Sequence, residues 1–132
     1  MNALLWTAGL AQLVVSAANL PVARVLRLRE EFGRLSPMPR HIALTHHAYI
    51  AGLIAAFGAL CLLFAPELAS GRPLALFLDG LLALFWGVRT CLQLFVYDRE
   101  LRRRHRAADL AFTGVFAFLT ATFVICLARE MA

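Results

Sequence analysis

The sequence contains little charge and no lysine. Only 16% of the 132 residues are charged, whereas 61% are hydrophobic, and the mean hydropathy is +0.74. This composition excludes an ordinary water-soluble domain and predicts an integral membrane protein. All 13 basic residues are arginine, including positions without evident chemistry such as Arg34, which indicates codon bias rather than a mechanism.

Several motifs of enzymes and metal sites are also absent. The chain has no CxxC, no GxSxG and no phosphate-binding loop. Its cysteines, Cys61, Cys91 and Cys126, lie in apolar segments and are expected to be small buried side chains, with a Cys61–Cys126 disulfide as the alternative. Four histidines are too few for the several histidine boxes of a di-iron membrane enzyme. We therefore predict no metal site.

Four apolar runs are each long enough to cross a membrane. About 20 helical residues, at roughly 1.5 Å each, span the ~30 Å hydrocarbon layer. The predicted spans cover residues 3–23, 42–65, 74–97 and 107–128. The predicted fold class is all-α, a four-helix transmembrane bundle with up-down connectivity that forms one integral-membrane domain over residues 1–132.

The segment between the first two spans, residues 24–40, is rich in charge and has apolar residues at 3-4-3 spacing. These residues are Val25, Leu28, Phe32 and Leu35. The spacing predicts a short amphipathic segment, followed by an extended elbow at Pro37 and Pro39. An arginine-lined docking surface for anionic lipid is the functional alternative to an ordinary topogenic loop.

Small and polar residues predict which helix faces pack together. In the second span, Ala48, Gly52 and Ala56 recur every four residues, which favours this helix as the central packing helix. A second row of alanines lies alongside, at Ala51, Ala55 and Ala59. The first span carries a polar face that should point into the bundle, because lipid offers it no hydrogen-bond partner. This face consists of Gln12, Ser16 and Asn19.

Arginine counts in the connecting segments predict the orientation. Five arginines lie in residues 24–40 and five in residues 98–106, whereas the connection between the second and third spans has only Arg72. The positive-inside rule places the two arginine-rich segments in the cytoplasm and both termini outside, in a bacterial inner membrane. This clustering in short loops also argues against nucleic-acid binding.

One arginine, Arg89, lies inside the apolar third span, and an ionisable residue there is a functional candidate. Polar residues of all four spans occur at a similar depth, in the half facing the cytoplasm. The candidate ligand-binding residues are Arg89, Gln93, Tyr97, Asn19, His46, His47, Trp86 and Asp109. Because adjacent helical residues diverge by about 100°, at most one of His46 and His47 points inward.

Two structural explanations compete with a ligand site. Arg89 could extend its long side chain toward the interface, or it could form an ion pair with Asp109 that ties the third and fourth spans together. Asp79 lies ten residues from Arg89, about 15 Å along one helix, and is too distant to pair with it. It is expected to be protonated, bonded to Thr7 or Thr122, or exposed to a water-filled notch.

The leading functional hypothesis is a non-enzymatic membrane protein that binds an amphiphile, such as a lipid headgroup or a quinone, or serves as an accessory subunit of a membrane complex. The alternatives are an enzyme that uses a histidine as acid or base on a lipid-dissolved substrate, and a dimeric small transporter. No catalytic residue is assigned and no cofactor is expected. The alternative is a redox subunit with a single b-type haem bound between His46 or His47 and His105. The expected partners are the bilayer, an anionic lipid or quinone, and a second copy or a complex partner.

Overall fold

The computed structural model describes all 132 residues and contains helices but no strands. Four helical units are long and apolar enough to cross a membrane: α1 (Asn2–Val25), α3 (Pro37–Leu63), α5 (Pro73–Cys91) continued by η1 (Leu92–Val96), and α7 (Arg106–Met131). Three short helices complete the chain: α2 (Leu28–Gly33), α4 (Ala65–Leu68) and α6 (Arg99–Arg104). The prediction of an all-helical chain with four such helices is confirmed.

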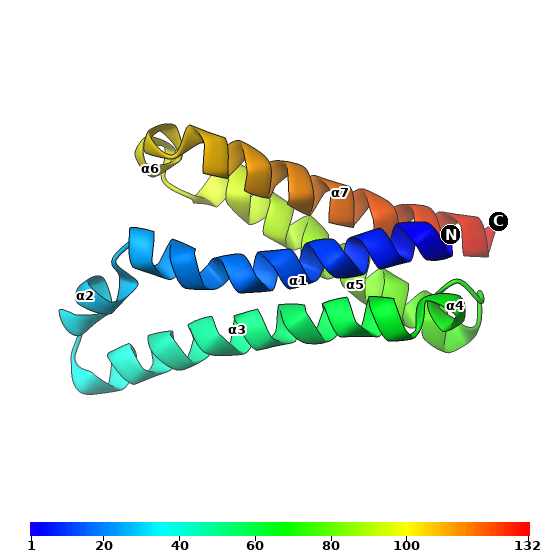
Figure 1. Ribbon diagram of the computed structural model, residues 1–132, viewed down its shortest axis with the longest axis horizontal. Coiled ribbons are helices and arrows are strands. Elements are labelled where there is room, and N and C mark those ends of the chain that lie inside the picture. Colours follow the sequence, from blue (N-terminus) through cyan, green and yellow to red (C-terminus); the bar gives the residue numbers. More distant parts are fainter.

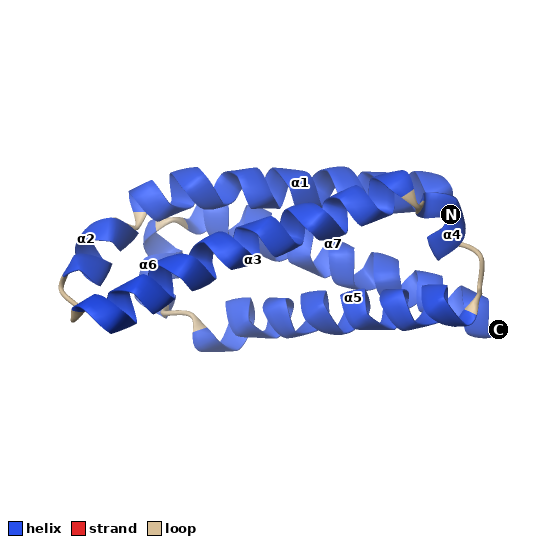
Figure 2. Ribbon diagram, turned by 90° about the horizontal axis from the view of Figure 1, so that it is seen from below, coloured by secondary structure: helices blue, strands red, loops and turns tan.

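The long helices pack as two pairs, α1 with α3 and α5 with α7, and the pairs meet where α1 contacts α7 (Figures 1 and 2). One end of the molecule carries α2 and α6, and we call it the arginine end (Figure 1). The opposite end carries α4 and both chain termini, and we call it the terminal end. The two arginine-rich connections therefore lie together, far from Arg72.

Proline marks the start of α3 and of α5. Pro37 and Pro73 each occupy a first-turn position of their helix. Proline is favourable there because the first N–H groups of a helix have no intrahelical acceptor and the ring already fixes a helical φ. The predicted elbow at Pro37 and Pro39 is therefore wrong, since α3 begins at Pro37 and runs without interruption to Leu63.

The segment between α1 and α3 contains a short helix, α2, but only part of the predicted apolar face is covered, since Val25 and Leu35 are exposed. In α2, Leu28 and Phe32 are partly buried, whereas Arg29, Glu30 and Glu31 are exposed. At the terminal end, Gly71 adopts a φ of +66°, which glycine accepts without steric cost, and α5 follows directly after this turn.

The core of the bundle is apolar and rich in aromatic rings. Trp86 of α5 is fully buried and lies between the ring of Phe85 and the ring of Phe116, with centroids 5.2 and 5.5 Å away. The Trp86 indole N–H donates to Oε1 of the buried Gln12 at 3.1 Å, so α1 and α5 are joined by a polar contact inside the core. The buried position of Gln12 agrees with the predicted inward polar face of α1.

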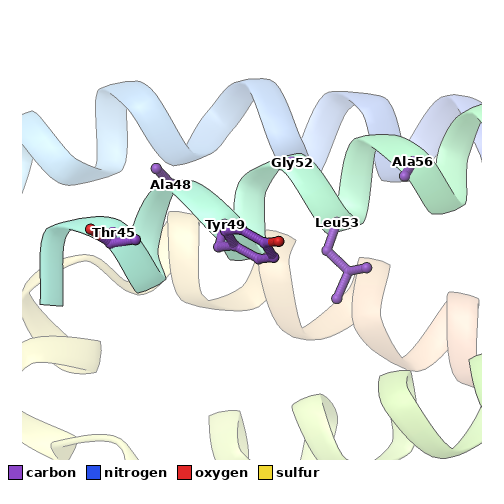
Figure 3. Close-up of a pocket in the computed structure, with 6 residues that line it drawn as sticks. All are labelled: Thr45, Ala48, Tyr49, Gly52, Leu53 and Ala56. Carbon is purple, nitrogen blue, oxygen red and sulfur yellow. The ribbon is translucent and has the colours of Figure 1, made fainter. Parts of the chain in front are cut away.

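The predicted small-residue stripe of α3 does not pack against a neighbouring helix. Ala48, Gly52 and Ala56 lie on an outward surface with Tyr49 and Leu53 (Figure 3). No heavy atom lies within 4 Å of the position that a Cβ of Gly52 would occupy, and Tyr49 is 76% exposed. The expectation that this stripe makes α3 the central packing helix is wrong.

The contact between α1 and α3 is made instead by Gly9 and Gly58. A Cβ on Gly58 would lie 2.9 Å from the carbonyl oxygen of Gly9, and a Cβ on Gly9 would lie 3.0 Å from that of Gly58. The Ser16 hydroxyl also donates to the carbonyl of Ala51 at 2.8 Å, in the alanine row beside the predicted stripe. The backbones of α1 and α3 can therefore approach this closely because neither glycine has a side chain at the contact.

Candidate functional site

A cavity of about 560 Å³ lies at the arginine end, bounded by α1, α2, α3, α5, η1, α6 and α7. Twelve of its 21 lining residues are hydrophobic, so its wall is mainly apolar with a limited set of polar groups. Six of the eight predicted ligand-binding residues line it. These are Asn19, His47, Arg89, Gln93, Tyr97 and Asp109. The structure therefore brings residues from all four long helical units to one cavity.

Arg89 lines this cavity without a carboxylate partner. One of its terminal nitrogens donates to the hydroxyl of Tyr97 at 2.8 Å. The guanidinium carbon lies 5.1 Å from the centroid of the Tyr97 ring and 4.7 Å from that of Phe116. Both rings are within the distance at which an aromatic face attracts a cation. Arg89 is thus positioned by two aromatic rings and keeps its net charge.

The prediction of an ion pair between Arg89 and Asp109 is wrong, because Asp109 forms its ion pair with another arginine. Arg102 of α6 donates through Nε to Oδ1 at 2.7 Å and through a terminal nitrogen to Oδ2 at 3.1 Å. Gln93 adds a third hydrogen bond to Oδ1 at 2.8 Å. The hydrogen bonds that Arg102 donates to Asp109 raise the pKa of Arg102, and a bidentate pair of this kind has a defined geometry.

The backbone conformation at the end of α5 explains where the side chains of Gln93 and Tyr97 lie. Residues Leu92–Val96 form a π-helical turn, closed by the Tyr97 N–H donating to the carbonyl of Leu92 at 3.2 Å. Tyr97 then leaves the helix in an extended conformation, and its hydroxyl reaches Arg89. Such turns change the direction of side chains relative to an uninterrupted helix and recur at functional sites.

The structure separates the two neighbouring histidines, as the helical spacing predicts. His47 is partly buried and lines the cavity. His46 is exposed, and its Nδ1 lies 2.8 Å from the carbonyl oxygen of Ile42 on its own helix. His46 is therefore not placed at the site, because its position on α3 faces away from the other long helices.

Trp86 is the other predicted residue that does not line the cavity. It is fully buried behind Phe116, whose ring does line it. Asn19 is present at the cavity, where its side chain donates to the carbonyl of Val15 at 2.9 Å. Trp86 and Gln12 thus form a buried layer between the cavity and the terminal end.

Metal-ligating side chains do not gather anywhere in the chain. There is no group of three or more His, Cys, Asp or Glu residues that could hold a metal ion. The three cysteines are free: the Cys61 sulfur accepts from Gln12 at 3.4 Å, and Cys126 contacts the Met1 sulfur at 3.4 Å. His105, considered as a haem ligand with His47, also lines the cavity.

Sequence reasoning missed Arg102 and Phe116 as parts of the site. Arg102 is one of five arginines in its connecting segment, and it lies on α6 whereas Asp109 lies on α7, so no helical spacing in the sequence distinguishes it. Phe116 carried no signal, since it is one of ten phenylalanines in an apolar chain. Comparisons with protein-family models, with curated proteins and with solved structures find no match for this chain.

Proposed function

We propose that this chain is a small membrane protein that binds an amphiphile with an anionic or carbonyl headgroup in the cavity at the arginine end. In this proposal it forms one integral-membrane domain with up-down connectivity, in a bacterial inner membrane. Loops 24–40 and 98–106 face the cytoplasm and both termini face outside. The grouping of the arginine-rich connections at one end supports this orientation.

The outer surfaces of the long helices support insertion into lipid. At most 28% of the most apolar window of any of the four helices is buried within the chain. Large hydrophobic side chains such as Val14, Phe77, Leu84 and Phe95 are at least 65% exposed. In water these surfaces would favour aggregation, whereas in a bilayer they contact hydrocarbon.

The observation that carries the proposed binding activity is the unpaired charge of Arg89. Asp109, the only carboxylate of the polar layer predicted to pair with it, is already neutralised by Arg102. A guanidinium donor in a mainly apolar cavity is suited to an anionic or carbonyl oxygen, because both accept hydrogen bonds. The hydrophobic wall formed by residues such as Val15, Ile50 and Ile54 suits the tail of the same molecule.

The proposal is tested by extracting the protein together with its native lipids and measuring the retained small molecules by native mass spectrometry. We expect Arg89→Gln to lower retention of the amphiphile by about tenfold, the effect of one charged hydrogen bond. The control is Arg106→Gln, which removes the same charge from an exposed residue at the same end that does not line the cavity. The mass of the retained molecule distinguishes an anionic lipid from a quinone.

Equal retention by the unmodified protein and the Arg89→Gln variant would show that Arg89 binds no ligand. Equal losses in Arg89→Gln and Arg106→Gln would instead assign the effect to the overall charge of the arginine end. Circular dichroism of each variant checks that its helices are intact.

A second candidate function is a redox subunit with one b-type haem, and one observation favours it. His47 of α3 and His105 between α6 and α7 line the same cavity, and two histidines are a common pair of axial ligands. We expect a Soret band that disappears in His47→Ala and persists in His41→Ala, since His41 is exposed and does not line the cavity. A purified protein without this band would exclude the candidate.

A further inference from the structure

A second group of polar side chains lies at the terminal end, outside the cavity. Asp79 of α5 is fully buried, and neither of its carboxylate oxygens has a hydrogen-bond partner. Both carboxylate oxygens of Glu130 and the hydroxyl of the buried Thr122, on α7, are also buried without a partner. The Thr7 hydroxyl bonds to the carbonyl of Ala3, so neither predicted partner of Asp79 forms a hydrogen bond with it.

Neither Asp79 nor Glu130 forms an ion pair. Glu130 lies in the last turn of α7, where its Cβ is 3.9 Å from the position that a Cβ of Gly71 would occupy, so it lies at the terminal end. The sulfur of Cys126 on α7 lies 3.4 Å from the sulfur of Met1, so the start of α1 and its amino group are also at this end. All four ion pairs of the chain lie at the arginine end. The carboxylates of Asp79 and Glu130 therefore both lie at the terminal end without an arginine partner.

An ionised carboxylate is costly in this position. Removing a charge from water without pairing it costs several kcal/mol even after the protein relaxes. Two like charges in the same buried region add their mutual repulsion, which is why paired carboxyl groups commonly hold one proton between them. The folded state therefore favours uptake of a positive species at this site.

A proton suits the site better than a metal ion. A hard metal cation needs about six or more oxygen ligands, and no group of three metal-ligating side chains occurs in the chain. A proton needs only one carboxylate oxygen, with which it forms an O–H bond. Trp86 and Gln12 are fully buried and joined by a hydrogen bond, and we expect the proton to come from water at the terminal end.

We propose that Asp79 and Glu130 form a proton-binding carboxyl pair at the terminal end, separate from the amphiphile cavity. In this pair, one carboxylate accepts a proton from water and becomes a neutral carboxylic acid, while hydroxide or buffer base remains in solution. The pair then carries one negative charge instead of two. Such a residue within a membrane span is typical of proteins that bind or relay protons.

The experiment measures the C=O stretch of protonated carboxylic acids by infrared difference spectroscopy, on the full chain in vesicles, between about pH 4 and pH 9. We expect a band that grows as the pH falls and is absent in Asp79→Asn, which has nearly the same shape. Glu130→Gln removes the neighbouring negative charge and is expected to weaken proton binding at Asp79 by about tenfold. The control is Asp98→Asn, which removes an exposed carboxylate at the opposite end and should leave the band unchanged.

Identical spectra for the unmodified protein and Asp79→Asn over the whole pH range would overturn the proposal. The titration is repeated at fixed pH with sodium chloride replaced by choline chloride. No change is expected, and a band that sodium removes would assign the site to sodium instead of the proton. If Asp79→Asn does not fold, the Glu130→Gln titration still decides, because an unchanged proton affinity contradicts a coupled pair.

Discussion

The two ends of the bundle differ in how their carboxylates are paired. At the arginine end, carboxylates such as Asp109 have arginine partners, and Arg89 faces a cavity. At the terminal end, Asp79 and Glu130 are enclosed and have no hydrogen-bond partner. An unpaired charge beside a cavity is available to a ligand, whereas an unpaired charge in a closed region must be neutralised where it lies.

The fully buried layer formed by Trp86 and Gln12 separates the two regions. A substitution in this layer is expected to have the largest effect on stability. Trp86→Ala removes a buried ring packed on Phe85 and Phe116 and should lower the free energy of unfolding by about 3–5 kcal/mol. It also leaves Oε1 of Gln12 without its donor. The measurement is unfolding by denaturing detergent, followed by circular dichroism.

Trp6→Ala is the matched control, because Trp6 is 50% exposed and should contribute much less to stability. A similar loss in both variants would mean that the Trp86 layer does not separate two structural regions. Increased access of a thiol reagent to Cys61, which contacts Gln12, would independently report that Trp86→Ala opens this layer.

A substitution at the close contact between α1 and α3 is expected to have the second-largest effect on stability. Gly58→Ala places a methyl group 2.9 Å from the Gly9 carbonyl oxygen, and we expect a loss of about 1–3 kcal/mol in the same unfolding assay. Gly52→Ala is the control, since its Cβ would contact nothing and alanine favours a helix by about 0.5–1 kcal/mol over glycine. A greater loss in Gly52→Ala would show that the outward stripe of α3 is the true contact.

The smallest effect is expected when one of the charges that line the cavity is removed, and it is an effect on ligand retention. Asp109→Asn removes the charge that neutralises Arg102, which also lines the cavity, so a second arginine becomes available to an anionic headgroup. We expect retention of an anionic lipid to increase several-fold, up to about tenfold, in native mass spectrometry. Glu67→Gln serves as the control, because it removes one negative charge at an exposed position that does not line the cavity and makes no ion pair. Unchanged retention in Asp109→Asn would show that the headgroup does not reach Arg102.

The helices and part of the cavity follow from the sequence. The predicted spans overlap the four long helices, and the polar face of α1 places Gln12 inside. The spacing of His46 and His47 shows that one of them must point away, and His47 lines the cavity. These predictions depend on residues a few positions apart on one helix, where spacing alone fixes direction.

The errors concern contacts between elements that are distant or irregular. Ala48, Gly52 and Ala56 have the spacing of a packing stripe, but spacing does not say which face of α3 meets α1. The pairing of Asp109 with Arg102 depends on the direction in which the chain leaves the π-helical turn and enters α6. A pattern that assumes regular helices contains no information on that direction.

Four long apolar helices, with charge concentrated in the connections between them, follow from the order of the amino acids alone. Helix length and apolarity are local properties, because each helix satisfies its own backbone hydrogen bonds. Which charges remain unpaired depends instead on how the helices pack. Arg89 is left free and Arg102 is neutralised because partner choice depends on which side chains the packed helices bring within about 3 Å of each other.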